Sequence, residues 1–220
     1  MLKLVGAIAL ALAIFLTLCA QPAESPTTPS TPAKDLTSIY TGFKTLQKGE
    51  WAQWRVSNGE VVTLTYVFAG REKLNGKSSY GIEFSSEIQG KKAIVQVWFS
   101  EDGSSFKYVA KVPEGIFCFP FIQVEGEMPS PSTPDEYSPE TIVKGRYEFG
   151  KHTVAGKTIN VVKVFIEGNE TWVSGEVPFG MVKVINQGKT VMELLDFGSG
   201  KTPEISFNEV LNCRQYPMMP

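Results

Sequence analysis

The sequence predicts a mostly β protein: one large, curved antiparallel sheet, a half-barrel of about ten strands, with one helix before it. Two observations support this prediction. The 220 residues include 14 Phe, 7 Tyr and 4 Trp, which are residue types that favour pleated sheet. From residue 51 onward, apolar and polar residues alternate in short runs that are separated by turn residues.

The expected helix runs from Leu36 to Leu46, before the first strand. Ile39 and Phe43 lie between these two residues at the spacing of one helical face, and Asp35 can cap the start. After this segment the apolar period changes from that of a helix to that of a strand, so the rest of the domain is expected to be sheet.

A series of hairpins is expected after the helix. Asn58-Gly59 is a strong hairpin signal between the runs 51–57 and 61–68. Further runs follow at residues 80–85, 93–99, 106–112, 143–149, 159–166, 171–173, 181–186 and 191–197. Several of them have one apolar face and one polar face, which suits a sheet wrapped around something on its apolar side. A closed sheet and a two-sheet sandwich are the alternatives for the same strands.

The N-terminal residues predict export and tethering. Lys3 precedes an uncharged, mostly apolar run at 4–18, which fits an export signal and is short for a spanning helix of about 20 residues. Cys19 follows this run, and residues 1–19 resemble the lipobox segment of exported lipoproteins, which makes Cys19 the expected site of lipid attachment. Secretion after cleavage at Ala20 and an uncleaved membrane anchor are the alternatives.

The rest of the chain divides into a linker and one domain. Residues 20–34 are rich in Pro, Ser and Thr and predict an extended linker. The β domain is expected over 35–216, held through its N-terminus at the outer face of the cytoplasmic membrane or the cell surface. An irregular insert is expected at 113–140, where an apolar segment is followed by four prolines. The insert is either a core-crossing segment with a surface loop or the rim of a cavity.

The remaining cysteines suggest a structural link. In an exported domain, Cys118 and Cys213 are expected to form a disulfide, because the outer side of the membrane is oxidising. The alternative is two free thiols, each buried as a small apolar residue.

The composition excludes several classes of function. His152 is the only histidine, so a histidine-based triad or a multi-histidine metal site cannot form, and we expect no enzyme, no metal and no cofactor. A net charge of −2, with Lys and Arg spread along the chain, argues against nucleic-acid binding. Asn169 begins an Asn-Glu-Thr glycosylation sequon in an expected turn. The four tryptophans fit core packing better than sugar stacking.

One stretch carries a family resemblance. Residues 171–198 read TWVSGEVPFGMVKVINQGKTVMELLDFG, and a long hairpin at 51–68 follows the expected short helix. This order of strands resembles exported lipoproteins related to the lipoprotein carriers LolA and LolB, over roughly residues 36–200. The resemblance implies an incomplete β-barrel whose apolar concavity binds lipids, lipid-modified proteins or other apolar partners without catalysis.

The expected function follows from the many apolar strand faces and the single helix predicted to cover them. We expect a surface-tethered, non-catalytic binding protein that holds a lipid or other apolar ligand in the concave face of the sheet. The expected lining residues are Leu64, Tyr66, Phe68, Phe84, Val97, Phe99, Phe117 and Phe119. The alternative is a structural or adhesion β-sandwich of the cell envelope that binds a protein or glycan.

Overall fold

A computed structural model describes residues 45–58, 60–88, 91–101, 105–119, 122–123, 146–166 and 168–215. All of them belong to the compact unit Pro32–Pro220. The predicted export signal with Cys19, the linker, and the predicted helix as far as residue 44 therefore lie outside the described residues.

The described strands form two runs of hairpins. The first meander contains β1 (Trp51–Asn58), β2 (Glu60–Leu74), β3 (Lys77–Ile88), β4 (Lys91–Ser100), β5 (Ser105–Val112) and β6 (Gly115–Cys118). The second meander contains β8 (Arg146–Val154), β9 (Lys157–Ile166), β10 (Asn169–Val173), β11 (Met181–Asn186) and β12 (Lys189–Gly198). The short elements are β7 (Ile122–Gln123), α3 (Phe207–Asn212) and β13 (Arg214–Gln215).

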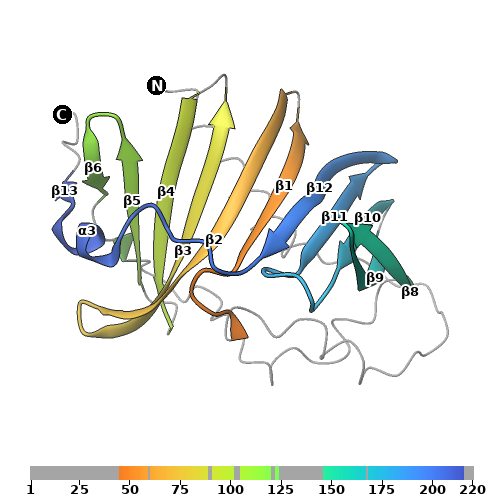
Figure 1. The fold of residues 1–220 in the computed structure, drawn as a ribbon, viewed down its shortest axis with the longest axis horizontal. Helices are drawn as coiled ribbons and strands as arrows, with labels where there is room; N and C mark the ends of the chain where they lie inside the picture. The colour runs from red at the N-terminus through yellow and green to blue at the C-terminus, as the bar shows by residue number, and fades with distance from the viewer. Residues whose placement is uncertain are drawn as a thin grey trace. The chain divides into compact units, whose positions relative to one another are not determined.

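The two meanders join into one sheet through the antiparallel pair of β1 and β12 (Figure 1). The strand order is β13-β6-β5-β4-β3-β2-β1-β12-β11-β10-β9-β8, with β7 beside β5. Only the β13–β6 pair of these is parallel. The sheet is curved and not closed into a barrel, which confirms the predicted fold class. The two alternatives, a closed sheet and a two-sheet sandwich, are wrong for the described strands because these form a single open sheet.

Three tight turns have the same backbone signature. Asn75-Gly76, Ala155-Gly156 and Gln187-Gly188 each have two successive positive φ angles, between 49° and 80°. This is the pattern of the type I′ hairpin turn, whose twist matches the strands on either side. The strands that meet at the Asn75-Gly76 turn, β2 and β3, are longer than the runs predicted at 61–68 and 80–85. Asn-Gly is a strong hairpin signal, but the predicted strand boundaries did not make use of it at this position.

The pairing register defines two faces of the sheet, because residues directly opposite each other in antiparallel strands lie on the same face. Tyr66 in β2 lies opposite Ala52 and Phe84, and Phe84 lies opposite Val95. We call this side the apolar face. The row on the other side of the first meander consists of Val67, Glu83, Gln96, Val109 and Cys118.

The C-terminal residues cover that other side. The segment 201–213, which we call the C-terminal strap, crosses β3, β4 and β5 and includes α3 (Figure 1). Ser206 caps α3 in a capping box with Glu209, and Val210 is fully buried. We call the side beneath it the strap face. The apolar residues packed there are Ala69, Leu74, Ile94, Trp98, Val109, Cys118, Ile205 and Val210.

A disulfide fixes the end of the strap. Cys118 in β6 is bonded to Cys213, with the two Cα atoms 5.5 Å apart, which confirms the predicted pair. The strap then continues into β13, which pairs with β6. Both β6 and β7 lie within the predicted insert 113–140; the residues between 124 and 140 lie outside the described part of the chain.

Candidate functional site

The residues predicted to line a ligand site lie on one face. Through the register, seven of them share the apolar face of the first meander: Leu64, Tyr66, Phe68, Phe84, Val97, Phe99 and Phe117. Phe119, the eighth, follows the end of β6 two positions after Phe117. The alternation in the sequence therefore located one continuous apolar surface spanning β2 to β6.

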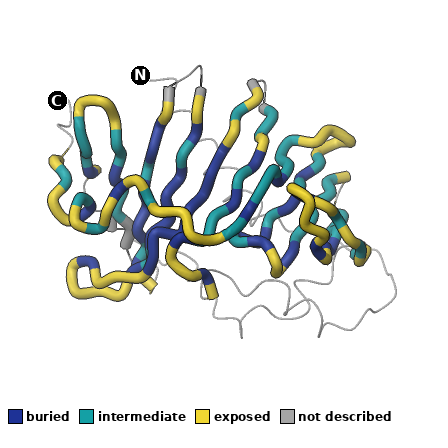
Figure 2. The backbone as a smooth tube through the Cα atoms, in the orientation of Figure 1, coloured by how far each residue is buried: buried dark blue, intermediate teal, exposed yellow. Residues whose placement is uncertain are grey.

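Burial varies along this surface. Leu64, Tyr66, Phe68, Phe84 and Val97 are buried, with between 1% and 8% of each residue exposed. Phe99 and Phe117 are half-buried, and Phe119 is 38% exposed. The surface thus passes from a buried centre on β2 and β3 to an accessible margin near the ends of β4 and β6 (Figure 2).

Four aromatic rings pack at the centre of the apolar face. Tyr66 lies edge-on to Trp54 at 4.8 Å, to Phe84 at 4.6 Å and to Phe179 at 5.6 Å between ring centroids. The indole nitrogen of Trp54 donates a hydrogen bond of 2.9 Å to the carbonyl of Met181. Burial raises the pKa of the Tyr66 hydroxyl, so this ring stays neutral at physiological pH.

Phe179 reaches this cluster from the segment between β10 and β11. Its φ is +67°, an uncommon value for a residue with a side chain. The segment is closed by hydrogen bonds from Ser174 N to Gly180 O (2.8 Å) and from Gly180 N to Val177 O (2.9 Å). Phe179 and Trp54 were not among the predicted lining residues; the Pro-Phe-Gly bend at 178–180 was the available signal for a side chain turned toward the sheet.

The apolar face continues onto the second meander. Leu194 lies opposite Trp54 and is buried, and Val162, also buried, lies opposite Phe149. At the β8 edge of the sheet the apolar side chains are exposed to solvent: Phe149 is 54% exposed and Ile166 is 50% exposed. The apolar face therefore extends across both meanders and is most open at its two margins.

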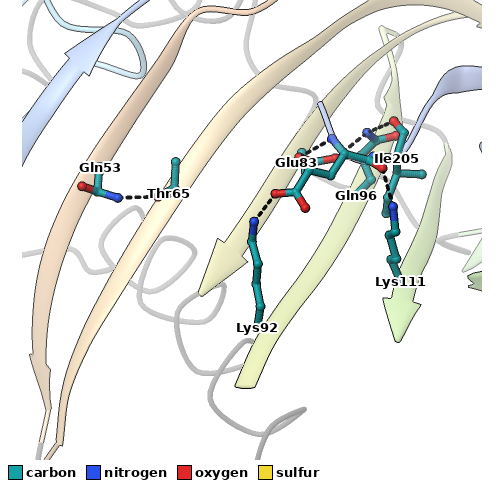
Figure 3. A network of polar contacts seen from close by, with 8 residues as sticks. Gln53, Thr65, Glu83, Lys92, Gln96, Lys111 and Ile205 are labelled. Carbon is teal, nitrogen blue, oxygen red and sulfur yellow. Dashed lines mark hydrogen bonds and ion pairs between the residues drawn. The ribbon is translucent and has the colours of Figure 1, made fainter. Parts of the chain in front are cut away.

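The strap face holds a buried carboxylate with internal partners (Figure 3). Glu83 accepts hydrogen bonds from the backbone nitrogens of Glu204 and Ile205, both at 2.9 Å, and from the Gln96 amide at 3.2 Å. Gln96 also donates to the carbonyl of Ile205 at 2.8 Å. Burial raises the pKa of Glu83, and these hydrogen bonds oppose that rise. Because its oxygens are used to hold the strap, Glu83 has a structural role.

Basic side chains extend this attachment. Lys111 donates to the carbonyl of Glu204 at 2.9 Å, and Lys107 donates to the carbonyl of Val210 at 2.6 Å. Lys92 forms an ion pair with the side chain of Glu204 (Figure 3). The strap is therefore held by polar contacts along its length as well as by apolar packing.

The only histidine lies on the second meander, on the same side of the sheet as the strap face. His152 contacts Trp172 edge-on at 5.1 Å, and Lys163 and Lys183 lie 4.3 Å and 5.5 Å from the Trp172 ring. Burial and the two lysines lower the pKa of His152, although Glu193 opposes the shift. His152 is therefore neutral at pH 7 and forms part of an aromatic and cationic surface.

The remaining predicted positions are spread over the molecule. Asn169 begins β10 beside the turn residue Gly168 and is half-buried, away from the centre of the apolar face. Among the residues described, no group of His, Cys, Asp or Glu side chains is arranged to hold a metal ion. Within the same described ranges, no helix is both long enough and apolar enough to span a bilayer.

The chain matches no protein-family model and no curated protein sequence. The function is therefore inferred from the residues and geometry of the sheet.

Proposed function

We propose that this chain is a surface-tethered, non-catalytic binding protein whose apolar face holds a lipid or another apolar ligand. One observation carries the proposal. The described helix and the C-terminal strap both pack on the strap face, so neither of these two elements covers the apolar face. Among the described contacts, Phe179 covers only the part of that face near Trp54 and Tyr66.

The chemistry of the face supports this role. Ligand sites for apolar molecules are lined mainly by aliphatic and aromatic side chains, with few polar groups. The eight predicted lining residues have this composition, and Phe99, Phe117 and Phe119 form the accessible margin through which a ligand would enter. The resemblance to lipoprotein carriers of the LolA and LolB type favours the same class of ligand.

The N-terminal sequence supports the tether. Lipid attachment at Cys19 would anchor the chain in a membrane, and residues 20–34 would extend the β domain away from it. The partners implied are therefore the membrane itself, through the N-terminus, and an apolar small molecule, lipid or lipidated protein on the apolar face. The single histidine supports a role without catalysis.

The test uses two neighbouring residues of β6 that lie on opposite faces. Phe117 is half-buried on the apolar face, whereas Ile116 is half-buried against the strap-face cluster. The full chain is purified in an amphipathic polymer and extracted with organic solvent, and the bound molecules are quantified by mass spectrometry. Phe117→Ser removes the contact of one Phe side chain, which contributes about 1.5–3 kcal/mol of binding free energy. Ligand occupancy should therefore fall roughly tenfold or more under subsaturating conditions.

The matched control is Ile116→Ser, which should lower stability and leave ligand occupancy per folded molecule unchanged. The proposal fails if the purified wild-type chain carries no apolar molecule in an amount comparable with that of the protein. It also fails if the two variants lose the ligand to the same extent, because binding would then not be specific to the apolar face.

A further inference from the structure

One polar side chain interrupts the buried part of the apolar face. Ser86 in β3 is 6% exposed, and its hydroxyl has no hydrogen-bond partner among the residues that the structure describes. It lies directly opposite Leu64 in β2 and Ala93 in β4, both of which are buried. Ser86 therefore places an unpaired donor and acceptor within an apolar surface.

Comparison with other buried polar residues shows that this is unusual for the protein. The Gln53 amide donates to the Thr65 hydroxyl at 3.0 Å, and the Ser79 hydroxyl donates to the carbonyl of Lys77 at 3.2 Å. The Ser174 hydroxyl accepts from the Glu176 nitrogen at 3.2 Å. Buried polar groups are nearly always satisfied, and an exception calls for a partner that the protein itself does not supply.

The surroundings of Ser86 suggest where such a partner would lie. Leu64, Ser86 and Ala93 form one row across three strands, and the neighbouring row contains Tyr66 and Phe84. Ser86 and Ala93 have small side chains, whereas Tyr66 and Phe84 in the neighbouring row carry aromatic rings. Because Ser86 and Phe84 lie on the same face in neighbouring rows, a ligand whose apolar part contacts Phe84 would bring a polar atom within reach of the Ser86 hydroxyl.

The charge of the partner is limited by the same register. Glu87 and Lys92, which lie opposite each other next to Ser86 and Ala93, are on the strap face and cannot contact a ligand on the apolar face. In the row of Ser86 itself, the neighbouring residues Trp54, Leu64 and Ala93 carry no charge, and Lys91 lies one row further along, opposite Ile88. Burial of a charge without a partner in contact is costly. A neutral group such as a hydroxyl or a carbonyl meets the requirement.

We propose that the Ser86 hydroxyl is the polar contact of the bound ligand, which is an amphipathic molecule with a neutral hydroxyl or carbonyl group. This inference rests on the proposed function and adds the chemical class of the ligand and its orientation. The neutral group hydrogen-bonds to Ser86, and the apolar part extends over Phe84 toward the margin at Phe117. Ser86 thus distinguishes an alcohol or ester from a pure hydrocarbon.

The test compares 1-dodecanol with dodecane on the full chain held in an amphipathic polymer, with affinity measured by native mass spectrometry. Wild type is expected to bind the alcohol more tightly than the alkane. Ser86→Ala should weaken binding of the alcohol roughly fivefold to tenfold, the usual effect of losing one hydrogen bond, and leave binding of the alkane unchanged. Without ligand, Ser86→Ala should melt at a higher temperature, because it removes an unsatisfied buried hydroxyl.

Ser85→Ala is the matched control, because Ser85 lies opposite Thr65 and Ile94 on the other side of the same strand. This variant should keep the preference for the alcohol. An unchanged preference in Ser86→Ala, or an equal loss of both probes, overturns the role of Ser86 and leaves the proposed function standing. Failure of wild type to bind either probe overturns the proposed function itself.

Discussion

The two meanders have the same strand pattern but differ in what covers them. On the strap face of the first meander, residues such as Glu83, Gln96 and Trp98 are buried under the C-terminal strap. On the same side of the second meander, Trp172 and His152 remain half-buried, and lysines flank the indole ring. Apart from Ser174, the described buried polar and charged residues all belong to β2, β3 and β4.

This difference shows that an alternating strand does not by itself determine which of its faces is buried. The first meander is covered because residues about a hundred positions away return to it and are held there by Glu83, by lysines and by a disulfide. Such a cover allows polar side chains to be buried, since Glu83 and Gln96 find backbone partners in the strap. Without a described cover of this kind, the second meander keeps its charged groups partly in water.

The largest expected contrast comes from one tryptophan in each meander. Trp98 is 1% exposed, packs against Phe207 at 5.0 Å and lies so close to β3 that a Cβ at Gly81 would be 2.6 Å from its ring. We expect Trp98→Ala to lower the free energy of unfolding by about 3–5 kcal/mol. Trp172→Ala should cost much less, about 1 kcal/mol, because this ring is only half-buried. Urea unfolding of both variants measures the difference, and equal losses would remove the distinction between the meanders.

The disulfide should give the next largest effect, and it should act mainly on the first meander. Reduction of the Cys118–Cys213 bond is expected to lower stability by about 2–4 kcal/mol, because it frees the strap from β6. Hydrogen exchange should then accelerate in β5 and β6 more than in β9 and β10. The double variant Cys118→Ala with Cys213→Ala should be insensitive to reductant. Uniform acceleration over both meanders would mean that the strap stabilises the whole sheet.

The smallest expected effect concerns the pH dependence of the buried carboxylate. Burial raises the pKa of Glu83 above its unfolded value near 4.5, so the folded state holds this proton more tightly than the unfolded state. Its contribution to stability is therefore fully present below pH 4.5 and is lost as the pH rises through the folded pKa. Urea unfolding between pH 4 and pH 8 should show this loss in wild type, measured as the difference from Glu83→Gln.

The control for this measurement is Glu209→Gln in the capping box of α3. Hydrogen bonds to Ser206 lower the pKa of Glu209, so its contribution has the opposite sign and is lost as the pH falls. At neutral pH, Glu83→Gln should also destabilise the protein by about 1–3 kcal/mol. The reason is that the NH₂ group of Gln is a donor, so it cannot accept the hydrogen bond that one Glu83 oxygen accepts from a backbone N–H group. Identical pH profiles for wild type and Glu83→Gln would contradict the direction of the shift.

Much of the fold could be predicted because strand alternation is local. The period of two assigned Leu64, Tyr66 and Phe68 to one face of β2, and the expected series of hairpins placed β3 and β4 beside it. The pairing of Cys118 with Cys213 was predicted from the expectation that the domain is exported to an oxidising environment, and the structure confirms the pair. The prediction did not include Phe179 and Trp54, because their contact depends on a bend and a strand pair that are distant in sequence.

The sequence by itself determined the class of fold, the apolar surface from β2 to β6 and the residues that occupy it, because side-chain alternation and turn chemistry act over a few residues. Only the tertiary structure decided that β1 pairs with β12 and that the strap covers one face. It also decided that Ser86 is left without a described partner on the other face. These features depend on contacts between residues far apart in the chain, whose geometry no local pattern specifies.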